Sequence, residues 1–134
     1  VEASGIAIAT ATAMCLGVPF VFAKKSKTNN ISGDVYSADA YSYTHNTANT
    51  VIVPCTYLSE SDKVLIVDDF LARGEAVGAL ADICDKAGAE IVGAGILIEK
   101  SFQSGRGILE KRGIRVESLA RVSKLDPISG VAFL

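Results

Sequence analysis

The sequence predicts an α/β fold with an open parallel sheet flanked by helices. The continuous aliphatic run at residues 64–67 is typical of a parallel strand that is covered on both faces, and residues 91–98 predict another buried strand. Between them, residues 75–87 place apolar side chains at helical spacing. A shorter helix at 105–112 and a final strand at 116–122 continue the alternation of strand and helix. This order predicts a parallel sheet whose connections are right-handed crossovers.

The first residues of the chain predict a helix and then a short strand. Residues 5–16 are mostly apolar, which indicates a helix packed on several sides, and Gly17 is a natural stop. Residues 18–23 predict a short buried strand. The uncharged run of 18 residues at 6–23 is interrupted by Gly17 and Pro19, and no basic segment precedes it. We therefore expect neither a membrane span nor a signal peptide.

A polar segment at residues 24–34 separates these elements from two further strands. Its length in a compact domain is typical of a flexible lid or binding loop. Residues 35–43 and 50–57 predict two strands, and residues 44–49 predict a hairpin or ribbon connection between them.

Size and composition fit one globular domain. The 134 residues suffice for a core, and 49% of them are hydrophobic against 21% charged. A net charge of −2 argues against general affinity for nucleic acid. Cys15, Cys55 and Cys84 lie far apart in apolar surroundings, so we expect buried, reduced thiols in a cytosolic protein. The chain starts without methionine, as if at the end of a strand, and we expect a further N-terminal segment in the natural protein.

Two adjacent acidic residues, Asp68 and Asp69, follow the aliphatic run 64–67. Buried carboxylates side by side repel each other unless something compensates. The small residues at 72–76 let the backbone turn closely at the start of the next helix, whose free N–H groups favour an anion. The turn lacks the lysine of a Walker loop and the glycine spacing of a dinucleotide fingerprint. A phosphorylated sugar satisfies both features, because the carboxylates accept hydrogen bonds from its hydroxyls or share a divalent cation with it.

These residues resemble a known family. "VLIVDDFLARGEA" is similar to the phosphoribosyl-pyrophosphate signature of the type I phosphoribosyltransferases. "VEASGI" resembles the pyrophosphate loop of that family, and "FAKKSK" resembles the entry to its flexible β-ribbon hood. "GILIEKSFQSGR" and "RVESLARV" are similar to its xanthine-type members, so the resemblance covers essentially the whole chain as a single phosphoribosyltransferase domain.

The resemblance implies a purine-salvage enzyme. Such an enzyme transfers the 5-phosphoribosyl group from phosphoribosyl pyrophosphate to xanthine, or to guanine or hypoxanthine, and releases pyrophosphate. The resemblance also implies Mg²⁺ as cofactor and a cytoplasmic homodimer with no nucleic-acid or membrane partner. One alternative is a purine transcription regulator that uses the same fold to sense phosphoribosyl pyrophosphate. Another is a structural fragment with no activity of its own.

The same resemblance implies roles for particular residues. Asp68 and Asp69 are the catalytic candidates and would hold the ribose hydroxyls. Lys100 would recognise an exocyclic oxygen of the base, and Phe102 would stack on its ring. The 5′-phosphate would be bound by Ala72, Arg73, Gly74, Glu75 and Ala76. The pyrophosphate would be bound by Lys24 and by the backbone of Ala3 and Ser4, in a loop that contains a cis peptide, and no residue is assigned as a direct metal ligand.

The chain departs from the family pattern at two places. Arg73 and Ala76 stand where many members have threonine, so backbone N–H groups must carry more of the phosphate binding. The N-terminal residues with which the xanthine enzymes enclose the base are absent here, so we expect an incomplete base pocket. Glu75 is interpreted as a helix-start residue rather than a catalytic acid. Residues interpreted as sheet packing or as solvent-facing are Tyr36, Tyr41, Tyr43, His45, Arg106 and Arg112.

Overall fold

The computed structural model describes residues 1–25, 33–42 and 47–134 and has the α/β architecture that the sequence predicts. The elements are, in order, α1 (Ser4–Leu16), β1 (Lys24–Lys25), β2 (Val35–Ser42), β3 (Thr47–Pro54), a 3₁₀ turn (Cys55–Tyr57), β4 (Lys63–Leu71), α2 (Glu75–Ala87), β5 (Glu90–Lys100), α3 (Gly105–Lys111), β6 (Val116–Asp126) and β7 (Gly130–Phe133). Most of the predicted loop at 24–34 and part of the predicted hairpin connection lie outside the described residues.

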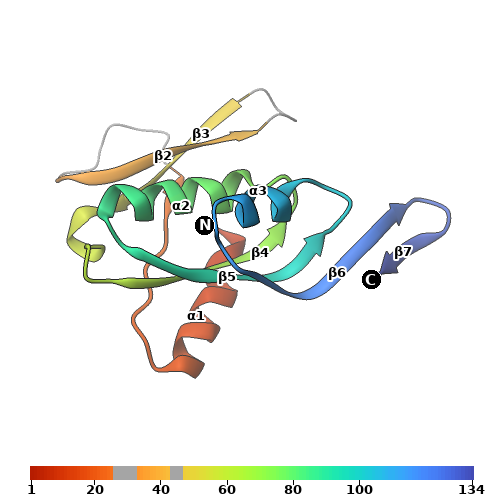
Figure 1. The fold of residues 1–134 in the computed structure, drawn as a ribbon, viewed down its shortest axis with the longest axis horizontal. Helices are drawn as coiled ribbons and strands as arrows, with labels where there is room; N and C mark the ends of the chain where they lie inside the picture. Colours follow the sequence, from red (N-terminus) through yellow and green to blue (C-terminus); the bar gives the residue numbers. More distant parts are fainter. Residues whose placement is uncertain (26–32, 43–46) are drawn as a thin grey trace.

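The main sheet has the strand order β4-β5-β6-β7 (Figure 1). The first three strands are parallel, as predicted: Asp68 of β4 lies opposite Ile96 of β5, which lies opposite Ser118 of β6. β7 is missing from the prediction and runs antiparallel to β6, so the sheet is mixed at this edge. The turn between them is closed by Asp126, whose Oδ1 accepts the N–H groups of Ile128 and Ser129 at 2.9 and 2.8 Å.

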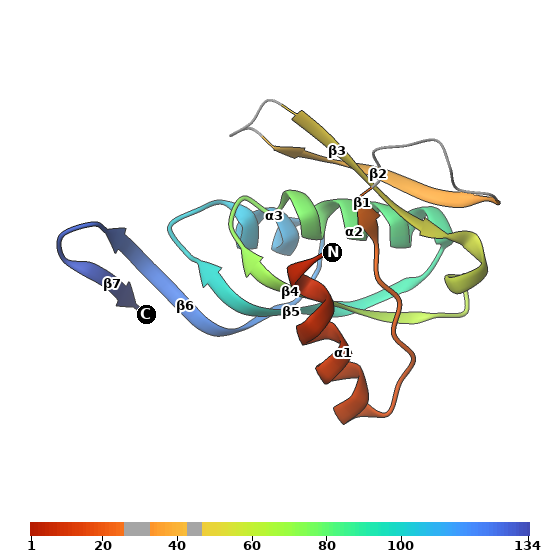
Figure 2. The same cartoon turned by 180° about the vertical axis from the view of Figure 1, so that it is seen from behind.

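Helices lie on both faces of this sheet (Figures 1 and 2). α2 and α3 cover one face, α1 contacts β4, and the antiparallel β2–β3 ribbon lies across α2 on the side away from the sheet. α2 therefore has two buried sides: Val77 joins the core at the sheet, and Ile83 joins the core beneath the ribbon. Leu65 of β4 is exposed, so the prediction that this strand is covered on both faces holds only partly.

Two predictions for the N-terminal residues are wrong. Residues 18–23 form no strand, and only Lys24–Lys25 pair with β3. Apolar composition favours burial, but a strand also needs a neighbouring strand to pair with, and residues 18–22 pair with none in the described part of the chain. α1 has nearly the predicted bounds, yet it buries only Gly5 and Ala13 because it packs mainly against β4.

The three cysteines are free but differ in burial. Cys84 is buried, and burial raises the pKa of its thiol to about 11. Cys55 is half-buried and Cys15 is exposed, so the prediction of buried thiols is right only for Cys84. Among the described residues, no helix combines the length and apolar character required to cross a membrane.

Candidate active site

The acidic pair lies near the carboxyl end of β4, shortly before α2. β4 continues through Asp68 and Asp69 to Leu71, so the pair belongs to the strand rather than following it. Asp68 is only 5% exposed, whereas Asp69 is half-buried. The structure thus places both carboxylates at the carboxyl end of a parallel strand, where ligands of open α/β sheets bind.

Asp68 packs against the first residues of the chain. Its Oδ1 lies 3.4 Å from the N-terminal amino group of Val1. A side chain on Gly5, in the first turn of α1, would collide with the same oxygen. The pKa of the Asp68 carboxyl is raised above its ordinary value, mainly by burial. The amino group of Val1 opposes this rise, and the charge of Asp69 adds to it. Gly5 therefore leaves the room that a buried carboxylate needs at this point.

Residues 72–76 form the predicted tight turn. Gly74 has a left-handed φ of 89° and precedes α2, and no side chain caps the helix, so its first N–H groups point toward the turn without a side-chain acceptor. The N–H of Gly105 donates to the carbonyl of Ala72 at 3.0 Å. A Cβ on Gly105 would lie 2.5 Å from that carbonyl oxygen and 3.0 Å from the nitrogen of Gly74. The turn is therefore packed backbone to backbone on the start of α3.

The rest of this turn matches the sequence analysis. Glu75 is the first residue of α2, where a carboxylate is favoured by the helix dipole, as interpreted. Arg73 is exposed, and Ala72 and Ala76 are half-buried. With no hydroxyl side chain in the turn, an anion there would be bound by backbone N–H groups.

Lys100 and Phe102 lie at the carboxyl end of β5, the strand beside β4. Lys100 is the last residue of β5, and its Nζ lies 5.5 Å from the centroid of the Phe70 ring. Phe102 is 49% exposed in the turn that follows. The carbonyl of Lys100 accepts the N–H of Gln103 at 2.9 Å, which closes this turn. Phe70 is missed by the sequence analysis, although its place directly after the acidic pair is a usable signal.

The predicted pyrophosphate-binding residues lie together at the start of α1. Ala3 and Ser4 are exposed, and the peptide bond between Glu2 and Ala3 is cis, in the loop where the resemblance implies one. The N–H of Glu2 donates to the carbonyl of Ala23 at 3.0 Å, and the carboxylate of Glu2 accepts the N–H of Lys25 at 3.0 Å. These bonds hold the loop beside the exposed Lys24.

Of the predictions for the three tyrosines and His45, the structure tests only the one for Tyr36. Tyr36 of β2 packs against the core beneath the ribbon, as predicted. Tyr43 and His45 lie outside the described residues, as does the side chain of Tyr41.

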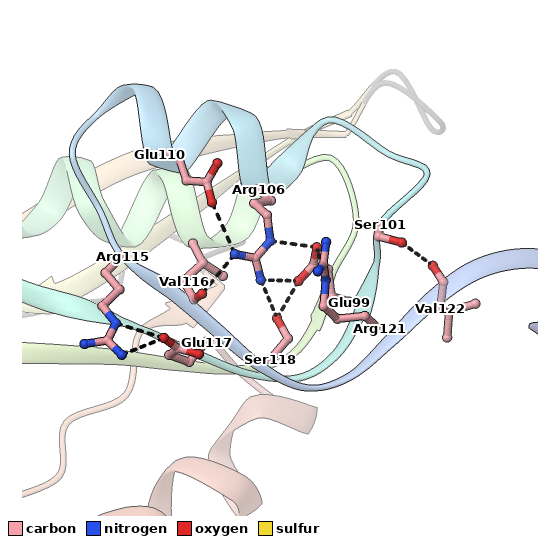
Figure 3. Close-up of polar contacts among 10 residues, drawn as sticks. All are labelled: Glu99, Ser101, Arg106, Glu110, Arg115, Val116, Glu117, Ser118, Arg121 and Val122. Atoms are coloured by element: carbon pink, nitrogen blue, oxygen red, sulfur yellow. Dashed lines mark hydrogen bonds and ion pairs between the residues drawn. The ribbon is translucent and has the colours of Figure 1, made fainter. Parts of the chain in front are cut away.

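The prediction that Arg106 faces solvent is wrong, because this residue is half-buried, whereas Arg112 is exposed as predicted. Both belong to the end regions of α3 and both bind carboxylates (Figure 3 shows the first). Arg106 donates to Glu99, from Nε at 2.9 Å and from Nη2 at 2.6 Å. Arg112 binds Asp82 at 2.8 Å and Asp85 at 2.7 Å, both on α2. Helical periodicity identifies the arginines as polar but does not identify the carboxylates that other elements bring to them.

Glu99 is a buried carboxylate that the sequence analysis does not include in the site. It is 1% exposed and directly precedes Lys100. Besides Arg106, Ser118 donates to it at 2.6 Å and Arg121 at 3.3 Å (Figure 3). The hydrogen bonds from Arg106 are the main reason that the pKa of Glu99 falls to about 2, so the carboxylate is ionised at neutral pH.

An apolar groove of about 520 Å³ lies between α1, residues 18–23 and β4, away from the turn at 72–76. Its lining is mainly aliphatic and aromatic, which suits neither a phosphate nor a sugar diol. In the described part of the chain, no three His, Cys, Asp or Glu residues are grouped so that they could hold a metal ion.

Together these features define an α/β domain in which the start of α2 lies beside two carboxylates at the end of β4, with a lysine at the end of the neighbouring strand. A family model described as "Phosphoribosyl transferase domain" matches residues 1–112. The chain belongs to this family of phosphoribosyltransferase domains.

Named relatives narrow the comparison. The chain is 51% identical to the xanthine phosphoribosyltransferase of Brevibacillus brevis over 134 residues, which are 100% of this chain and 68% of that protein. It is 51% identical to the xanthine phosphoribosyltransferase of Limosilactobacillus fermentum, over 93% of this chain and 64% of the relative. The crystal structure of adenine phosphoribosyltransferase from Thermoanaerobacter pseudethanolicus superposes with a TM-score of 0.78 at 28% identity, over 90% of this chain and 66% of that one. The chain thus spans about two thirds of the length of these relatives, none of which is named as a transcription regulator.

Proposed function

We propose that this chain acts in purine salvage as a glycosyltransferase. It transfers the 5-phosphoribosyl group from phosphoribosyl pyrophosphate to xanthine, or less readily to guanine or hypoxanthine, giving the nucleoside monophosphate and pyrophosphate. The observation that carries the proposal is the placement of the acidic pair, the uncapped start of α2 and Lys100 at the ends of two adjacent parallel strands. The identity of 51% to xanthine phosphoribosyltransferases supports the choice of base.

The phosphoribosyl half of the substrate fits the turn and the acidic pair. The backbone N–H groups at 74–76 would bind the 5′-phosphate at the positive end of α2. Asp68 and Asp69 would accept hydrogen bonds from the ribose hydroxyls. When the bond from C1 of the ribose to pyrophosphate breaks, positive charge develops on the sugar, and the nearby carboxylates stabilise it. Pyrophosphate leaves with the electrons of the broken bond, and a ring nitrogen of the base bonds to C1 and releases its proton to solvent.

The leaving group fits the start of α1. Ala3 and Ser4 are exposed there beside Lys24, so their backbone and the lysine charge would bind pyrophosphate. Mg²⁺ at such sites is held by one or two carboxylates together with the phosphates of the substrate. Asp68 and Asp69 fit an ion that arrives with phosphoribosyl pyrophosphate, and Mg²⁺ would neutralise the leaving pyrophosphate.

The purine fits the end of β5. Lys100 carries only hydrogen-bond donors, so it would pair with an exocyclic oxygen of xanthine, guanine or hypoxanthine and not with the amino group of adenine. The exposed ring of Phe102 offers a surface on which the purine would stack, and the ring of Phe70 holds the ammonium group close by. We also propose a cytoplasmic homodimer with no nucleic-acid or membrane partner.

The direct test is a transfer assay on this chain with phosphoribosyl pyrophosphate, Mg²⁺ and each of xanthine, guanine, hypoxanthine and adenine. Nucleotide and pyrophosphate are quantified by chromatography, and we expect product with xanthine at the highest rate and none with adenine. Calorimetric titration with phosphoribosyl pyrophosphate tests the sugar-phosphate site separately from the chemistry. The absence of both binding and nucleotide would reject the proposal, and light scattering of the same sample would test the dimer.

A further inference from the structure

The residue that precedes Lys100 is held far more tightly than Lys100 itself. Glu99 receives hydrogen bonds from α3 through Arg106 and from β6 through Ser118 and Arg121 (Figure 3). Lys100, by contrast, is half-buried, and the contact described for its ammonium group is with the Phe70 ring. A long, flexible lysine can select a base only if its backbone is fixed, so the anchor beside it determines where the ammonium group reaches.

Arg106 connects three elements at this point. In addition to its two bonds to Glu99, its Nη1 donates to the carbonyl of Val116 at the start of β6, at 3.0 Å. The same nitrogen bonds to Glu110, one turn further along α3, at 3.2 Å. The guanidinium thus ties the end of β5, the start of β6 and α3 in one planar, directional arrangement that an ammonium group could not reproduce.

The turn that carries Phe102 is fixed by the same neighbours. Ser101 bonds twice to the carbonyl of Val122 in β6, from its N–H at 2.9 Å and from its hydroxyl at 2.8 Å (Figure 3 shows the hydroxyl bond). The turn then ends at Gly105, directly before Arg106. Both candidate base contacts are therefore held between Glu99 on one side and the start of α3 on the other.

A role in stability alone explains this arrangement poorly. Buried ion pairs contribute little more to stability than well-packed apolar residues of the same size, because desolvation offsets the attraction between the charges. Their distinguishing property is direction: the guanidinium fork and the carboxylate define one relative orientation of two elements. The orientation fixed here is that of the end of β5, where Lys100 is located.

We infer that the Glu99–Arg106 ion pair is a positioning device for base recognition. Arg106 acts through Glu99 on Lys100 and Phe102, and it sets the preference among purine bases without contributing to the binding of the sugar phosphate. This inference rests on the proposed function, and Arg106 is a positioning residue rather than a catalytic one.

The test compares the arginines at the two ends of α3, Arg106 in its first turn and Arg112 directly after its last residue. Arg106→Lys keeps the charge but loses the fork, and Arg112→Lys makes the same change in an arginine that binds α2 instead. For each variant of this chain, calorimetry measures the dissociation constants of ribose 5-phosphate and of xanthosine monophosphate. The ratio of the first constant to the second isolates the contribution of the base to binding. We expect Arg106→Lys to reduce that ratio about tenfold, with ribose 5-phosphate bound as in the wild type. We expect Arg112→Lys to leave the ratio unchanged.

The inference is overturned if Arg106→Lys leaves the ratio unchanged, if Arg112→Lys lowers it equally, or if the affinity for ribose 5-phosphate falls by the same factor. Ser118→Ala removes one hydrogen bond to Glu99 and leaves the ion pair in place, so it should lower the ratio less. Should Arg106→Lys fail to fold, Ser118→Ala decides by the same ratio. A wild-type chain that binds neither ligand refutes the proposed function, whereas one whose ratio the variants do not change refutes only this inference.

Discussion

Replacing Glu99 by glutamine removes the charge at the centre of the buried network but keeps the shape of the side chain. The network holds the pKa of Glu99 at about 2, against an ordinary value of 4.5. At about 1.4 kcal/mol per pH unit, this difference is equivalent to about 3 kcal/mol of folding free energy at neutral pH. We therefore expect Glu99→Gln to lower the free energy of unfolding by about 3 kcal/mol at pH 7. The structural reason is that Arg106 loses the charge of its buried partner.

The pH dependence has a defined sign. The folded state holds the pKa of Glu99 below its unfolded value, so the stabilisation is complete above the unfolded value. It is lost as the pH falls from about 4.5 toward about 2. The stability of the wild type should fall through this window, and that of Glu99→Gln should fall less, because the glutamine does not titrate.

Urea unfolding followed by circular dichroism at pH 7 and at several values down to pH 3 measures both effects. Glu110→Gln is the matched control, because Glu110 binds the same arginine but its side chain is 52% exposed. We expect this control to change the free energy of unfolding by about 0.5 kcal/mol or less. Equal losses for the two variants at pH 7, or parallel pH curves for Glu99→Gln and wild type, would refute the reasoning.

Three further substitutions test the site. Asp69→Asn should weaken the binding of phosphoribosyl pyrophosphate, and an unchanged affinity by calorimetry would count against its role. Gly105→Ala should weaken the binding of ribose 5-phosphate about tenfold, because the new methyl group would displace the carbonyl of Ala72. Gly107→Ala is the control, because among the described residues a Cβ there would meet no atom within 4 Å outside the adjacent backbone of its own helix. Lys100→Ala should abolish the preference among purines while the sugar phosphate still binds; competition among xanthine, guanine and hypoxanthine measures this.

Elements with strong local signals could be predicted from the sequence. The bounds of α2 agree at both ends, since helical spacing of apolar residues begins after Gly74 and ends before Gly88. The parallel pairing of β4 with β5 follows from their aliphatic runs and the helix between them. The acidic pair and the turn at 72–76 carry chemistry in their residue types, so their place at a strand end could also be predicted.

Features that depend on what covers a residue could not be predicted. Within the part of the chain that the structure describes, the apolar residues at 18–23 have no neighbouring strand to pair with, and no local sequence pattern shows whether such a strand exists. β7 has only four residues, and all of them are exposed. Its sequence therefore lacks the alternation of apolar and polar residues that indicates a half-buried strand. Arg106 resembles any charged helix residue until the fold brings it to Glu99, seven positions earlier in the sequence.

The short helix α3 shows how these unpredicted contacts organise the site. A helix of seven residues is not stable by itself, so its position depends on tertiary contacts at its ends. Arg112 ties its last turn to α2, and Arg106 ties its first turn to Glu99. Gly105 lies between the two halves of the candidate site. It touches the backbone of the turn at 72–76, and it follows the turn at the end of β5. The two halves of the candidate site therefore share one support, and changes at Gly105 and Arg106, adjacent in sequence, should separate sugar-phosphate binding from base selection.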